Sequence, residues 1–132
     1  MVIFDSSIFV DDLRTGRYSG RVAMIGDLIR NSSVVLAELW RGTTTEAEKK
    51  FLRWLVAHYP VLTPSENNWL ESGPILQRVQ GDHGFESKKL RDLHFDVLIA
   101  LTARSHGARL ITSNRADFEL IRKYRQFKLE VW

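Results

Sequence analysis

Short apolar runs alternate with longer amphipathic stretches along the whole chain. The short runs predict five strands, over residues 2–4, 31–35, 61–62, 109–111 and 127–132. Strands that alternate with helices are typical of parallel sheets, because parallel neighbours need a long crossover connection. The pattern therefore predicts an α/β domain of three layers, with a mainly parallel central sheet flanked by helices.

The amphipathic stretches predict the helices between these strands. Their apolar spacing places them at residues 8–13, 22–29, 36–41, 43–59, 66–80, from 93 to the turn at Gly107, and 116–124. Pro60 is expected to end one helix, and Gly73 and Pro74 to interrupt the next. Asp92 is expected to cap the helix that begins at residue 93.

Asp96 lies in the most apolar of these helices. At about 100° per residue it shares a face with Ile99, Ala100 and Ala103, and the rest of the helix is apolar as well. An ionised carboxylate in such surroundings is costly unless a partner compensates its charge. The identity of that partner is the main chemical question that the sequence raises.

Composition narrows the possible chemistry. With 132 residues, 44% of them hydrophobic, the chain is long enough for one domain with a real core. The absence of cysteine excludes disulfides, thiolate metal sites and a thiol nucleophile. No apolar run approaches the roughly 20 residues of a membrane span, and the first residues do not resemble a signal peptide. We therefore expect a single domain over 1–132, cytoplasmic, without membrane contact.

The charge is unevenly distributed. The net charge is +3, yet residues 88–128 contain ten Lys and Arg against four Asp and Glu. A basic excess favours a polyanionic partner, although a solvated basic surface explains it as simply. Charge alone therefore only hints at nucleic acid.

Four acidic residues stand out by position. Asp5, Glu38 and Asp117 each follow a predicted strand closely, and Asp96 lies in a helix expected to pack on the sheet. In open parallel sheets, sites form beyond the carboxyl ends of the strands. Each acid also has an ordinary structural explanation, as a turn residue, an exposed helix position or part of a helix cap. Only the four together predict a site.

A cluster of carboxylates requires compensation. Two carboxylates about 5 Å apart repel by roughly 3 kcal/mol at an effective dielectric constant of 20, so a group of them must take up protons or hold a cation. Oxygen ligands select Mg²⁺, with Mn²⁺ as a possible substitute. Such a metal can activate a water molecule for attack on a phosphodiester bond.

Four segments carry a family resemblance. V-I-F-D-S-S, V-V-L-A-E-L-W-R-G, F-D-V-L-I-A-L-T-A and L-I-T-S-N-R-A-D-F resemble, in order, the four motifs of PIN-domain ribonucleases, and specifically the VapC-type toxins of type II toxin-antitoxin systems. Each segment contains one of the four acids. The resemblance extends from the first strand to Phe118, and residues 43–88 lie outside its diagnostic motifs.

The resemblance implies both a fold and an activity. It implies a Rossmann-like PIN domain, Mg²⁺-dependent endonucleolytic cleavage of RNA, and a homodimer inhibited by a small antitoxin protein. Operator DNA would then be bound through the antitoxin alone. It maps the metal-binding and catalytic acids onto Asp5, Glu38, Asp96 and Asp117, with Ser6, Thr112 and Asn114 supporting them through hydrogen bonds.

Two arginines and two alternative functions remain open at this stage. Arg41 and Arg115 stand close to motif acids and are candidates for contacts to RNA phosphate, although a purely solubilising role is nearly as plausible.

The first alternative function is a non-catalytic PIN-like module that binds RNA or protein, which an intact set of acids argues against. The second is a housekeeping nuclease that acts on DNA or structured RNA.

Overall fold

The computed structural model describes residues 1–132 and contains a sheet of five parallel strands. The strand order is β3-β2-β1-β4-β5, with every neighbouring pair parallel. The predicted three-layer α/β class is confirmed. In chain order the elements are β1 (Val2–Phe4), α1 (Ser6–Thr15), α2 (Ser19–Ala23), β2 (Ile29–Ser32), α3 (Ser33–Arg41), α4 (Glu46–His58), β3 (Val61–Leu62), α5 (Glu66–His83), α6 (Ser87–Ser105), β4 (Arg109–Thr112), α7 (Arg115–Arg122) and β5 (Lys128–Val131).

The two faces of the sheet bury different side chains, as the alternation of a strand requires. Ile3 of β1 belongs to the larger core cluster, together with Val35 of α3 and Val97 of α6. Its neighbours Val2 and Phe4 belong to a second cluster on the other face, which α1 helps to form. Both faces of the central strands are therefore covered by helices.

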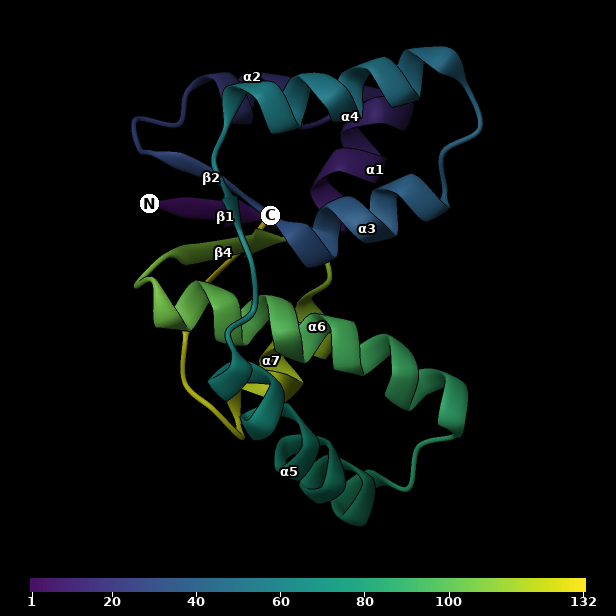
Figure 1. The fold of residues 1–132 in the computed structure, drawn as a ribbon, viewed down its shortest axis with the longest axis vertical. Coiled ribbons are helices and arrows are strands. Elements are labelled where there is room, and N and C mark those ends of the chain that lie inside the picture. Colours follow the sequence, from purple (N-terminus) through teal and green to yellow (C-terminus); the bar gives the residue numbers. More distant parts are fainter.

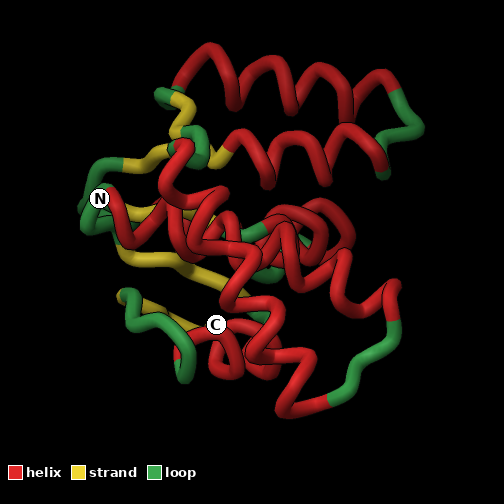
Figure 2. The backbone as a smooth tube through the Cα atoms, turned by 60° about the horizontal axis from the view of Figure 1, so that its bottom comes forward, coloured by secondary structure: helices red, strands yellow, loops and turns green.

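The helices reach well beyond the strands on one side. The 19 residues of α6 span about 28 Å, whereas the four residues of β4 span about 13 Å. In Figure 1 the carboxyl ends of β1 and β4 point to the right, and α3 and α6 extend past them. The view in Figure 2 likewise shows the strands at one side and helices projecting from them. The space beyond the carboxyl ends thus lies between helices.

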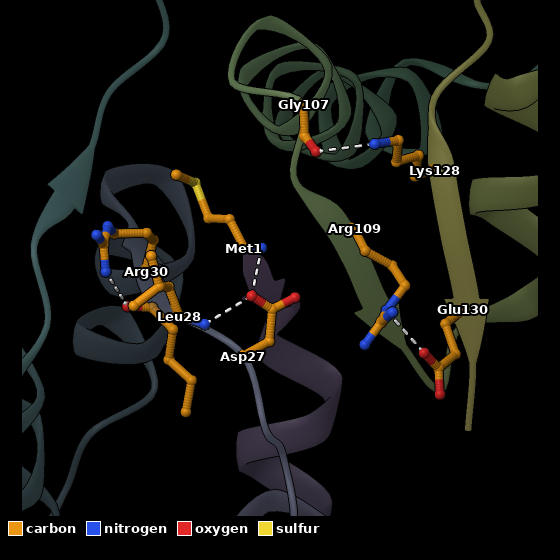
Figure 3. Close-up of polar contacts among 9 residues, drawn as sticks. Met1, Asp27, Leu28, Arg30, Gly107, Arg109, Lys128 and Glu130 are labelled. Atoms are coloured by element: carbon orange, nitrogen blue, oxygen red, sulfur yellow. Dashed lines mark hydrogen bonds and ion pairs between the residues drawn. The ribbon is translucent and has the colours of Figure 1, made fainter.

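The charges around the amino ends of the strands are paired. The N-terminal amine of Met1 lies 2.6 Å from Asp27, and Arg109 lies 2.8 Å from Glu130 (Figure 3). Lys128 donates to the carbonyl of Gly107 at 3.3 Å in the same region. Two ion pairs therefore neutralise charge at this end of the sheet.

Most predicted elements are found, and most of the errors lie at their ends. The helix predicted over residues 22–29 is wrong, because α2 ends at Ala23 and Ile29 already pairs with Val2 in β2. The strand predicted over residues 31–35 ends at Ser32, whose hydroxyl accepts the N–H of Val35 and so begins α3. Side-chain capping thus overrides the β propensity of two valines.

Two further errors concern α5 and α6. Pro74 does not interrupt α5, which continues to His83 and ends at Gly84 with a φ of 62°. Ile75 and Val79, which lie one turn apart after Pro74, are both buried, and their burial favours a continuous helix. Asp92 does not cap α6, since that helix begins one and a half turns earlier at Ser87. Asp96 is consequently in the middle of the helix rather than near its start.

No helix of the chain has the length and apolar character needed to cross a membrane.

Candidate active site

Asp5 is held directly at the end of β1. It is 3% exposed, and its Oδ2 accepts hydrogen bonds from the hydroxyls of Ser7 at 2.8 Å and Thr112 at 2.9 Å. Thr112 thus holds Asp5, as the resemblance implies. The side chain of Ser6 forms no hydrogen bond to Asp5 and lines the cavity beside Glu38, but the backbone of Ser6 does form a hydrogen bond to Asp5, which acts against the rise in pKa that burial causes in this acid. The serine whose side chain holds Asp5 is Ser7, which was not among the predicted residues and is the neighbour of the predicted Ser6.

A hydroxyl network extends from this carboxylate into the loop after β4. Ser7 Oγ also accepts the backbone N–H of Ser113 at 3.1 Å, and Ser113 donates to Asp11 at 3.0 Å. The start of α1 is therefore tied to the end of β4. Because β1 and β4 are neighbours in the sheet, this network fixes the position of Asp5 relative to the loop that carries Asp117.

Asp117 is the third residue of α7 and is half-buried. Asn114 caps that helix and donates to Asp117 Oδ2 at 3.1 Å, so the supporting contact implied for Asn114 is present. The other oxygen, Oδ1, accepts from Lys89 Nζ at 2.6 Å. Lys89 is the third residue of α6 and lies 28 positions before Asp117 in the chain. Nothing in the local sequence pattern predicts this ion pair.

Glu38 and Asp96 occupy the middle of two adjacent helices. Glu38 lies in the second turn of α3, so it does not follow its strand as directly as the sequence suggested. Asp96 is 9% exposed on α6, which packs against α3. Burial first, and then the charges of Asp5, Glu38 and Asp117, raise the pKa of Asp96 to about 9. The four acids therefore share one electrostatic neighbourhood.

The other carboxyl groups respond to the same conditions. Burial, and then the charge of Asp5, raises the pKa of Glu38 to about 7. Burial also raises the pKa of Asp5, against the hydrogen bonds from Ser7 and Thr112. Without a bound cation, at neutral pH this cluster retains protons that ordinary carboxyl groups would have lost.

The donor set fits a hard divalent cation in its chemistry. Asp5 Oδ1 and Glu38 Oε1 are buried and have no hydrogen-bond partner, which is costly unless a positive ligand reaches them. Carboxylate oxygens are the ligands that Mg²⁺ and Mn²⁺ prefer. As placed, however, no three His, Asp or Glu side chains stand close enough together to ligate one ion. Lys89 binds one oxygen of Asp117 and would therefore compete with a cation for it.

The two candidate arginines differ in their surroundings. Arg41 lines the cavity of about 680 Å³ that also contains Ser6 and Glu38, and its positive charge lowers the pKa of Glu38. Arg115 is two-thirds exposed and pairs with Glu119 one turn along α7 at 3.0 Å. Arg41 therefore faces the acids, whereas Arg115 is engaged at the surface.

Comparison with known proteins identifies the family. The family model described as PIN domain matches residues 2–124. The chain belongs to the PIN domain family. A search of curated proteins returned no match.

Solved structures share this fold over the whole chain. A chain of VapBC2 from Rickettsia felis, bound to a DNA fragment from its promoter, is similar with a TM-score of 0.73 and 23% identity, covering 100% of this chain and 99% of that one. A chain of VapBC-1 from nontypeable Haemophilus influenzae has a TM-score of 0.71 and 23% identity over 100% and 98% of the two chains. VapBC-5 from Mycobacterium tuberculosis, of the VapBC family of toxin-antitoxin systems, matches at 0.67 and 21% over 99% and 98%.

Proposed function

We propose that this protein is a Mg²⁺-dependent endoribonuclease and the toxin of a toxin-antitoxin pair, with Mn²⁺ as a possible substitute metal. The observation that carries the proposal is the acid cluster beyond the carboxyl ends of β1 and β4. There, Asp5 and Glu38 each keep a buried oxygen without a partner, in a chain of the PIN domain family. A module that only bound a polyanion would gain nothing from such a concentration of negative charge.

Asp5, Glu38, Asp96 and Asp117 would hold the metal once they draw closer together than in this structure, and Lys89 would then release Asp117. When bound, the metal supplies a Lewis acid that activates water and stabilises charge on the leaving oxygen of the phosphodiester. Ser7 and Thr112 orient Asp5, and Asn114 orients Asp117. Asp96 must release its proton before it can bind the metal.

The proposed partners are an antitoxin protein and, through it, operator DNA. The structurally similar VapBC complexes are described as toxin-antitoxin systems, and one of them is bound to DNA from its promoter. By analogy we propose a homodimer that a cognate antitoxin inhibits, with operator DNA bound through the antitoxin. The antitoxin would block the site by inserting a cationic or hydrogen-bonding side chain among the acids.

The first test is cleavage of total RNA by the purified protein, with Mg²⁺ or with EDTA. Discrete fragments should form only with Mg²⁺, and Asp96→Asn should form none while keeping its circular dichroism spectrum. Asp82→Asn is the matched control, because this carboxylate lies at the exposed end of α5 and bonds only to Tyr124. Full activity in the Asp96→Asn variant would refute the proposed role of the cluster.

A second test addresses the toxin role. Expression of the wild-type chain should arrest growth, and expression of Asp96→Asn should not. A short open reading frame directly upstream should restore growth when it is expressed as well. Cleavage in vitro without any effect on growth would favour a housekeeping nuclease instead.

A further inference from the structure

A second concavity lies beside the acid cluster and has the opposite charge. It has a volume of about 360 Å³ and is lined by Arg41, Lys88, Arg91, Asp92, His94 and Phe95. Three cationic side chains thus face a single carboxylate. Arg41 ends α3, and all the other residues come from the first three turns of α6, the part of that helix that extends beyond the sheet.

Arg41 connects the two concavities. It lines the basic one together with Lys88 and Arg91, and it lines the larger cavity together with Glu38. Asp92, also in the basic concavity, is close enough to Glu38 for its charge to raise the pKa of that acid. A chain molecule bound at the acids could therefore continue into the basic concavity without leaving the surface.

The cations of this concavity are not used inside the protein. Neither Arg41, Lys88 nor Arg91 forms an ion pair, whereas Lys89, Arg109, Arg115 and Arg125 all do. The Arg41 guanidinium lies 5.3 Å from the centre of the Phe95 ring, within the range of a cation–π contact. Cations without an ion-pair partner can bind RNA phosphates, and a guanidinium can stack on unpaired bases.

We propose that this concavity is an RNA subsite that holds the backbone next to the cleaved bond. Lys88 and Arg91 bind phosphates, and Arg41, supported by Phe95, stacks on a base. The inference rests on the proposed ribonuclease function and adds the path of the substrate. A polyanion that approaches four acids is repelled, so cations immediately beside them are needed to position it.

The test is a paired charge removal. Lys88→Gln combined with Arg91→Gln is compared with Arg122→Gln combined with Lys123→Gln, which removes the same charge at the end of α7, beside the amino ends of the strands. Binding of a labelled single-stranded RNA is followed by fluorescence anisotropy from 50 to 200 mM salt. Loss of two phosphate contacts should weaken binding about tenfold at low salt and reduce the slope of log K against log salt by about 1.4.

The same variants separate this inference from the proposed function. In cleavage assays, the variant of the basic concavity should show a raised KM with kcat little changed, and the control pair should match the wild type. Equal affinity and salt slope in both double variants would overturn the subsite, even if the wild type cleaves RNA. Dependence of RNA binding on Lys88 and Arg91 without any cleavage would support RNA binding at this concavity and refute the nuclease.

Two further measurements test its specificity. Arg41→Lys keeps the charge and loses the planar group, so it should weaken binding of RNA while leaving the salt slope unchanged; wild-type affinity would overturn the stacking role. Duplex DNA of equal length should compete poorly for the concavity. Competition as strong as that of the RNA itself would overturn the assignment to RNA.

Discussion

In metal-free protein, the free energy of unfolding should depend on pH through Asp96, and the substitution Asp96→Asn should remove this contribution. Burial and three neighbouring acids raise the pKa of Asp96 to about 9, whereas an aspartate in an unfolded chain titrates near pH 3.9. Between these values the folded protein holds a proton that the unfolded chain has released. The free energy of unfolding therefore falls as the pH rises through this window, and the contribution is fully favourable only below the unfolded pKa.

The size of the effect follows from one proton. Each pH unit inside the window costs about 1.4 kcal/mol, so the wild type should lose about 4 kcal/mol between pH 5 and pH 8 through Asp96 alone. Asparagine has nearly the same shape and no proton to exchange. From pH 5 to pH 8, the free energy of unfolding of the variant should thus rise by about 4 kcal/mol relative to that of the wild type. The pH dependence that comes from Glu38 remains in both proteins.

Urea unfolding in EDTA at pH 5, 6, 7 and 8, followed by circular dichroism, measures this difference. Asp82→Asn serves as the control, and its stability should run parallel to that of the wild type. Parallel curves for Asp96→Asn and the wild type would show that Asp96 is ionised in the folded protein. The reasoning from burial and mutual repulsion would then be wrong.

Four further predictions concern the metal and the packing. At pH 8, Mg²⁺ should raise the melting temperature of the wild type, and Asp96→Asn should lose most of that rise; an equal rise in both would place the ion elsewhere. Lys89→Met removes the cation that binds Asp117, so the Mg²⁺ concentration for half of the thermal shift should fall several-fold, and an unchanged midpoint would contradict competition between lysine and metal. Phe118→Ala should cost about 3 to 5 kcal/mol in urea unfolding, because Phe118 is fully buried, whereas Met24→Ala at an exposed position should stay within about 0.5 kcal/mol. Thr112→Val should cost about 1 to 3 kcal/mol, because it removes one of the two side-chain hydrogen bonds to a buried carboxylate and the acceptor of the Asn114 N–H; a neutral result would mean that the remaining hydrogen bonds suffice.

Local patterns were sufficient for the elements but not for all of their ends. Alternating strands and helices predicted the parallel sheet, and the strands at residues 2–4 and 61–62 were placed correctly. The end of β2 was misjudged because Ser32 caps α3, and the start of β2 because Ile29 pairs with β1. Pairing partners distant in the chain leave no trace in a local window.

Part of the site could be predicted from the sequence. Residues that follow strands of a parallel sheet must gather at one edge, so Asp5 and Asp117 could be placed together from the sequence. The family resemblance implied that Thr112 and Asn114 support the acids, and the structure specified the pairs, Thr112 with Asp5 and Asn114 with Asp117. Ser7 was missed because two adjacent serines on a helix start differ only in the direction that the helix gives them.

The sequence by itself thus determined the class of fold, the four acids and the uneven charge, since these depend on residue type and on spacing along one segment. The tertiary structure alone decided what surrounds the acids. It buried Asp96 on α6, which packs against α3, bound Lys89 to Asp117, and brought the end of α3 against the first turns of α6 to form the basic concavity. Charge interactions act through space and depend on burial, and both quantities exist only once distant segments have packed together.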